Sequence, residues 1–140
     1  MTKDALIGKL NEDLAGEYQA IIMYTTYAAT VTGPHRPALK DFFSAEIPEE
    51  LAHAQFLADK IASLGGTPVT EPRSVPQTDS PRQMLQNVLE AEKKAITDYK
   101  ARTQQAADYG DIGLSAHLET IVEDETSHYE ETEKMLRGWS

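Results

Sequence analysis

The sequence predicts an all-α protein, an antiparallel four-helix bundle in which one long crossover joins the second helix to the third. Two observations favour this fold class. Proline and glycine divide the 140 residues into four long stretches, and apolar residues recur within each stretch at the three- and four-residue spacings of an amphipathic helix. Each stretch is about 26 to 29 residues, or ~40 Å as a helix. Most of the stability of such helices comes from packing, so we expect them to pack together.

Capping signals and helix breakers give the boundaries of these helices. The third helix opens with Ser80, Pro81 and Gln83, which combine an N-cap serine, a proline in the first turn and a capping-box glutamine. The second helix stops before the pair Gly65 and Gly66. The four helices are expected at about residues 3–31, 37–64, 81–109 and 112–137.

The connections predict how the helices run. The links after the first and third helices are short, which favours two antiparallel hairpins. Residues 67–79 are rich in proline, threonine and serine, and we interpret them as an ordered crossover that lets the second and third helices lie parallel. Residues 1–140 are therefore expected to form one domain. Pro48 lies inside the second helix, so we predict a kink or bulge at residues 44–48.

Composition excludes several classes of protein. There are 23 acidic and 13 basic residues, a net charge of −10, which disfavours DNA binding. The absence of cysteine excludes disulfides and thiolate metal sites. No segment approaches the roughly 18 apolar residues that span a membrane, and the start of the chain lacks a signal-peptide pattern. We expect a cytoplasmic protein with no membrane partner.

Charged residues interrupt the apolar stripe of every helix near its midpoint. The first and third helices each carry one glutamate there, and the second and fourth each carry a Glu-x-x-His pair, whose spacing puts both side chains on one face. An unpaired buried carboxylate is too costly to keep charged, so four at one level predict cations between them. The candidate catalytic and metal-binding residues are Glu17, Glu50, His53, Glu92, Glu125 and His128.

The two halves of the chain repeat this arrangement. Glu50 follows Glu17 by 33 residues, and Glu125 follows Glu92 by the same number. The motif E-x-x-A-I-x-x-Y begins at Glu17 and again at Glu92. A single Glu-x-x-His is more often a solvated face, but two at matching positions predict two similar hairpins about a pseudo-two-fold axis. Two equivalent half-sites predict two metal ions.

Other polar residues fall close to the expected ligands. Tyr24 and Tyr99 end the repeated motif, and their hydroxyls need partners in a core; the nearest are the carboxylates, although both tyrosines could be plain core residues. Glu46 lies one turn before the glutamate of the second helix, as a further ligand or a way-station for ions, but its repeat counterpart is Ile121. The other two histidines are expected at the surface, His35 and His117.

These residues resemble the ferritin-like di-iron carboxylate superfamily, in which two helices each give a Glu and the other two each give a Glu-x-x-His. The resemblance is closest to bacterioferritins, over roughly residues 8 to 137, with Dps-like mini-ferritins as relatives. It is strongest at residues 10–24, 46–54 and 124–136.

The resemblance implies a role for each candidate. The single glutamates of the first and third helices would be terminal ligands, one per iron, and the two histidines would each supply one nitrogen. Glu50 and Glu125 would bridge the two irons. Glu49 and Asp124 match positions that orient the opposite histidine from behind.

Two departures from bacterioferritins alter the expected cofactors and assembly. The haem-binding methionine of that family is replaced by Leu51, so no haem is expected. The short fifth helix near the four-fold axis of a 24-subunit cage is missing after Ser140. A homo-oligomer is expected, with a 12-subunit cage favoured over 24.

The expected function is oxidation of ferrous iron. Carboxylate-rich sites with two histidines suit iron, or manganese, better than zinc or copper. Two ferrous ions held close would each give an electron to O2 or H2O2, and a hollow cage would store the ferric product. One alternative is a rubrerythrin-like peroxidase or oxidase with a separate electron donor. Another is a metal-binding or assembly protein without catalysis.

Overall fold

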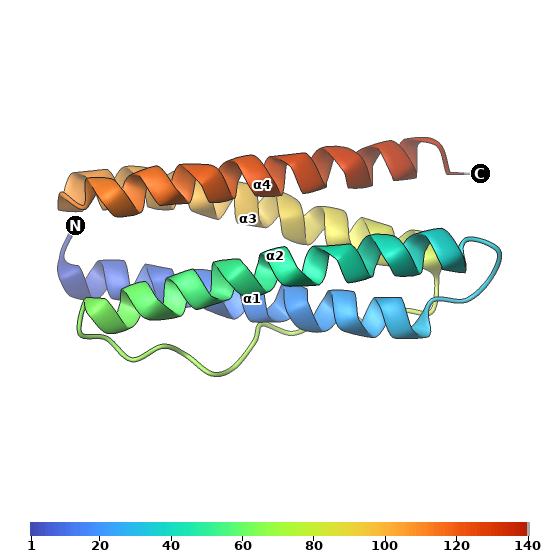
Figure 1. The fold of residues 1–140 in the computed structure, drawn as a ribbon, viewed down its shortest axis with the longest axis horizontal. Coiled ribbons are helices and arrows are strands. Elements are labelled where there is room, and N and C mark those ends of the chain that lie inside the picture. The colour runs from blue at the N-terminus through green and yellow to red at the C-terminus, as the bar shows by residue number, and fades with distance from the viewer. Residues whose placement is uncertain (140) are drawn as a thin grey trace.

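In the computed structural model, which describes residues 1–139, the chain forms a bundle of four long α-helices (Figure 1). This confirms the all-α fold class, and each helix begins and ends within one residue of its expected boundary. The helices are α1 (Lys3–Thr30), α2 (Arg36–Ser63), α3 (Pro81–Tyr109) and α4 (Ile112–Arg137).

The chain forms two antiparallel hairpins, α1 with α2 and α3 with α4, joined by the long crossover (Figure 1). The crossover carries the chain back along the bundle, so that α2 and α3 run in the same direction, as expected. Helices α1 and α3 also pack against each other. This contact is important for the site, because it joins the two hairpins along their middles.

Local sequence signals fix the ends of the helices. The side chains of Thr2, Ser80 and Asp111 each accept a hydrogen bond from a backbone N–H in the first turn of the following helix. The capping box predicted at the start of α3 is only half formed. The side chain of Gln83 donates to Asn87, one turn further along, instead of returning to the backbone of the N-cap.

The crossover is ordered because it is hydrogen-bonded along α1. Asn11 accepts from the backbone N–H of Val69 at 2.8 Å. The backbone N–H of Arg73 donates to the carbonyl of Ala15 at 3.1 Å. Farther along, the hydroxyl of Tyr27 donates to the carbonyl of Pro76 at 2.5 Å. These bonds hold the segment against α1, so the crossover is ordered, as the sequence predicted.

Pro48 lies inside α2 without ending it. Residues on both sides are α-helical, so the bulge predicted for residues 44–48 is not found, and the kink stays a prediction. Within residues 1–139, no helix combines the length and apolar character needed to cross a membrane.

Two apolar clusters fill the two ends of the bundle. One is built on Leu10, Leu57 and Leu118, and the other on Phe43 and Leu85, all at most 1% exposed. Two helices begin and two helices finish at each end of the bundle, and each cluster combines residues from all four. The polar residues of the helix midpoints are therefore enclosed between two dry layers.

Candidate metal centre

Four buried glutamates meet at the middle of the bundle, one from each helix. Glu17, Glu50, Glu92 and Glu125 are only 2–3% exposed. All four line one cavity of about 30 Å³, which is room for one or two waters or small ions. Their meeting follows from the position of each glutamate at the midpoint of its helix, as the sequence predicted.

Two buried histidines complete the cluster, each with Nδ1 facing the carboxylates. His53 Nδ1 lies 3.3 Å from Glu125 Oε1 and 3.6 Å from Glu17 Oε1. His128 Nδ1 lies 3.5 Å from Glu50 Oε1 and 3.8 Å from Glu125 Oε2. The cluster thus divides into a Glu17–His53 half-site and a Glu92–His128 half-site, with Glu125 close enough to ligand atoms of both to be shared.

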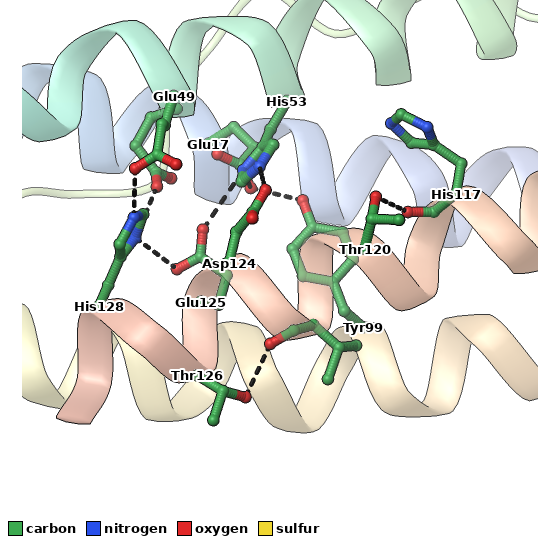
Figure 2. Close-up of polar contacts among 12 residues, drawn as sticks. Glu17, Glu49, His53, Tyr99, His117, Thr120, Asp124, Glu125, Thr126 and His128 are labelled. Carbon is green, nitrogen blue, oxygen red and sulfur yellow. Dashed lines mark hydrogen bonds and ion pairs between the residues drawn. The ribbon is translucent and has the colours of Figure 1, made fainter.

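The outer nitrogen of each histidine is held by an acid from the opposite hairpin (Figure 2). His53 Nε2 is 3.1 Å from Asp124 Oδ2 on α4. His128 Nε2 is 2.5 Å from Glu49 Oε2 on α2, and also 2.7 Å from Glu46 Oε2. An acid at Nε2 favours the tautomer with its proton there, which leaves the Nδ1 lone pair free for a metal.

Buried polar atoms without a hydrogen-bond partner mark where a cation fits. Within residues 1–139, all such side-chain atoms belong to the candidate ligands and to Glu46. Native proteins leave very few buried polar atoms unpaired, so this concentration indicates a missing charged partner. The ligand atoms are Glu17 Oε2, Glu50 Oε1, His53 Nδ1, both oxygens of Glu92, Glu125 Oε1 and His128 Nδ1. Glu46 Oε2 lies 2.7 Å from His128 Nε2 but does not form a hydrogen bond of good geometry with it.

Crowding and burial shift the protonation of the metal-free cluster. Burial raises the pKa of Glu50 well above its usual value, and the carboxylates of Glu17 and Glu125 raise it further. Burial also raises the pKa of Glu92 to about 8. Burial lowers the pKa of His53, but the nearby carboxylates of Glu125 and Glu17 outweigh it and raise the value to about 10. The cluster therefore retains protons near neutral pH, and metal binding would expel them.

One carboxylate of the cluster shifts the other way. Burial raises the pKa of Glu125, yet hydrogen bonds from His128 and His53 and one from Glu50 lower it to about 2. This carboxylate is therefore ionised near neutral pH. An ionised carboxylate between two half-sites is the ligand expected to hold both ions.

The two tyrosines of the repeated motif differ. The hydroxyl of Tyr99 donates to Glu17 Oε1 at 2.5 Å (Figure 2). Tyr24 lines the same cavity, but among residues 1–139 it has no corresponding hydrogen bond to Glu92. Burial raises the pKa of both tyrosines well above the usual value, so both hydroxyls keep their protons.

Sequence analysis missed a buried ion pair beside the cluster. Arg102 Nε and Nη2 donate to the two carboxylate oxygens of Asp13, at 2.7 and 3.0 Å. Both residues are 3–4% exposed. Asp13 precedes Glu17 by one helical turn, and Arg102 follows Tyr99 by three residues. Helical spacing alone could therefore have predicted that Asp13 and Arg102 face the bundle interior.

The histidines expected at the surface, His35 and His117, are exposed. His117 stacks on Phe56 with ring centroids 3.6 Å apart. Neither contributes a ligand atom to the buried cluster.

Comparisons with known proteins agree with this geometry. The sequence matches the family model described as ferritin-like domain over residues 7–139. It is 47% identical to a Bacillus anthracis protein described as ferritin-like, diiron-carboxylate, with a TM-score of 0.94, covering 97% of this chain and 99% of that one. Rhodobacter capsulatus bacterioferritin, described with a metal-free dinuclear site and a haem iron, shares the fold: 24% identity, a TM-score of 0.86, and coverage of 96% and 84%. Among curated proteins, none matches the sequence.

Proposed function

This chain belongs to the ferritin-like family, and from that premise we propose that it binds two ferrous ions inside its own bundle and oxidises them to ferric ions. The observation that carries the proposal is the set of unpartnered buried atoms, all on candidate ligands or on the neighbouring Glu46. Four carboxylates and two imidazoles are a donor set suited to iron or manganese.

We assign the ligands by half-site. Glu17 and His53 would serve one ion, and Glu92 and His128 the other. Two bridging carboxylates, Glu50 and Glu125, would contact both. Four distances of 3.3–3.8 Å between imidazole Nδ1 atoms and carboxylate oxygens support this assignment. They place one nitrogen close to carboxylate oxygens in each half-site.

The overall reaction balances with either oxidant. Each ferrous ion gives one electron. Dioxygen accepts two electrons and two protons and leaves as hydrogen peroxide, whereas hydrogen peroxide accepts the same and leaves as two waters. The chain contributes ligand charge and spacing, and the metal ions carry the redox change. The proposed role is iron storage or detoxification, with the ferric product held inside a homo-oligomeric cage, for which twelve subunits are favoured over twenty-four.

The decisive experiment is anaerobic ferrous loading followed by addition of O2 or H2O2. Ferric absorbance and bound iron are measured, and native mass is read by size exclusion with light scattering. We expect saturation at two ions per chain, rapid oxidation without added reductant, and a cage-sized mass. Saturation at one ion per chain, or ligands drawn from two chains, would contradict the intra-subunit centre.

The same experiment separates the alternative functions. A small oligomer that consumes peroxide only with an added reductant would instead be a rubrerythrin-like peroxidase. A chain that binds iron without oxidising it would be a metal-binding protein without catalysis.

A further inference from the structure

The cavity of the metal centre extends to the surface between α1 and α3. Its inner end is formed by the carboxylates of Glu17 and Glu92, which are 3% exposed and carry unpartnered oxygens. Its lining includes small side chains from both helices, Ala20 on α1 and Ala95 on α3, together with the acids Asp13 and Asp98. Small side chains leave room where two helices cross, so this is a built opening toward the ligand atoms.

One side chain of the crossover covers this opening. The guanidinium of Arg73 donates from Nη2 to the carbonyl of Glu12 at 2.8 Å and lies 3.9 Å from Asp98 Oδ2. It rests directly on Gly16: a Cβ added there would lie 2.8 Å from Arg73 Nη1. The guanidinium can therefore pack against α1 at this point only because residue 16 has no side chain.

The backbone also places this guanidinium. The N–H of Arg73 donates to the carbonyl of Ala15, so the residue is tied to α1 by its main chain and its side chain. A positive charge held at an opening that leads to carboxylates opposes the passage of another cation.

The opposite side of the cluster is also lined by acids, but no guanidinium from residues 1–139 lies across it. A groove of about 220 Å³ between α2 and α4 is lined by Glu49 and Asp124 and reaches His53. Lysine and arginine are absent from the described residues that line it. Figure 2 shows both acids beside the outer nitrogens of the histidines. The acids on this side attract a ferrous ion, whereas the guanidinium of Arg73 lies across the α1–α3 side.

We propose that Arg73 is a specificity-determining residue that closes the α1–α3 opening to metal cations, so that cations exchange through the acidic α2–α4 side. The inference rests on the proposed metal centre. A cover raises the barrier in both directions. Its removal should therefore speed binding and release by the same factor and leave the dissociation constant almost unchanged.

The test uses Co(II), which separates binding from oxidation, in stopped-flow uptake by the metal-free full-length protein and in release to a chelator. Arg73→Ala removes the cover and its charge. Gly16→Ala pushes the guanidinium from its seat and keeps the charge. Alanine is also the better helix former, so folding should be preserved. In both variants we expect uptake and release to accelerate about tenfold, which corresponds to a barrier lower by ~1.4 kcal/mol.

Each variant has a matched control. Arg82→Ala removes one positive charge from an exposed position away from the cavity. Gly8→Ala changes a glycine of the same helix whose added Cβ would meet nothing within 4 Å. Both controls should exchange Co(II) at the wild-type rate. Equal acceleration in Arg73→Ala and Arg82→Ala would overturn the proposal, because it would show an effect of net charge alone. A change in uptake without a change in release would overturn it too.

A second measurement does not need a metal. The chain has no cysteine, so Ala95→Cys places a single thiol on the wall of the opening. Its alkylation by iodoacetamide should be slow with Arg73 in place and several-fold faster when Arg73→Ala or Gly16→Ala is added. Equal alkylation rates in all three backgrounds would show that Arg73 covers nothing. If wild-type protein bound no Co(II), the metal centre would fail, while the thiol would still test the cover.

Discussion

The two half-sites have matching candidate ligands but different surroundings. Each offers a glutamate from the first helix of its hairpin and a histidine whose outer nitrogen contacts an acid. In the Glu17–His53 half-site the terminal carboxylate accepts a hydrogen bond from Tyr99. In the Glu92–His128 half-site neither oxygen of the terminal carboxylate has a partner.

The difference extends to the charges nearby. A third acid, Glu46, approaches the outer nitrogen of His128 at 2.7 Å, and its repeat counterpart on α4 is the apolar Ile121. Asp13 and Arg102 form a buried pair beside Glu17, and their repeat counterparts are Val88 and Tyr27. The internal repeat thus fixes the positions of the candidate ligands, whereas the residues around them differ. The two half-sites are therefore not expected to hold metal ions equally well.

The largest expected effect comes from removing what the half-sites share. Glu125→Ala takes away the carboxylate that lies within 4 Å of Nδ1 of both histidines, and we expect ferrous oxidation to slow by roughly two orders of magnitude or more, because neither ion is then held correctly. Glu50→Ala should behave alike. His35→Ala, which alters an exposed histidine away from the cluster and the α2–α4 groove, should oxidise iron at the wild-type rate. The rate of ferric absorbance after oxygen addition measures all three, and near-normal oxidation by either glutamate variant would remove the assignment of bridging ligands.

The next effect concerns the stability of the metal-free protein. Burial raises the pKa of Glu92 to about 8 from 4.5, so the native state binds a proton that the unfolded state has lost. This contribution to stability is complete below pH 4.5 and is lost as pH rises through 8. The pKa of His53 is raised from 6.5 to about 10, so its contribution to stability is lost as pH rises from 6.5 through 10. Metal-free protein should therefore become less stable from pH 5 to pH 8 and beyond.

Replacing Glu92 tests this linkage directly. Glu92→Gln removes one titrating group, so the loss of unfolding free energy between pH 5 and pH 8 should shrink by about 2–4 kcal/mol. The exposed neighbour Glu90→Gln should leave the wild-type pH dependence unchanged. Urea unfolding in chelator at the two pH values measures the difference. An identical slope in wild type and Glu92→Gln would mean that this carboxyl is not crowded in the core.

A smaller effect separates the two outer acids. Asp124→Asn removes the acid that contacts His53, and metal affinity should fall about 10–100-fold, as expected when the group that orients a metal-binding histidine is lost. Glu49→Gln should weaken binding less, because Glu46 still contacts the same nitrogen of His128. Isothermal titration with Co(II) compares the variants. Equal losses in both would mean that Glu46 does not substitute for Glu49.

The smallest effect concerns the tyrosines. Tyr99→Phe deletes the hydrogen bond to Glu17, and the metal-free protein should lose about 1–3 kcal/mol of unfolding free energy. Tyr24→Phe should change stability less, since no matching bond to Glu92 is lost. Thermal unfolding in chelator compares the two variants. A larger loss in Tyr24→Phe would reverse the asymmetry between the half-sites.

The sequence by itself determined the four helices and the meeting of their glutamates. These features are local and periodic: the capping serine at residue 80 and the glycines that follow α2 set lengths, and equal lengths bring midpoints to one level. Helical spacing then places Glu50 and His53 on one face whatever the neighbouring helix supplies. Periodicity and the local signals that end helices therefore predicted both the bundle and the candidate ligands that line its cavity.

Only the tertiary structure decided what stands next to each ligand. The hydrogen bond from Tyr99 without an equivalent from Tyr24, the pairing of Asp13 with Arg102, and the seat of Arg73 on Gly16 all join residues far apart in the chain. The half-formed capping box at Gln83 and the absence of a bulge at Pro48 belong here too. Such contacts depend on the rotation and spacing of the packed helices and on the path of the crossover. The packing of the whole bundle sets both, and no local sequence pattern encodes it.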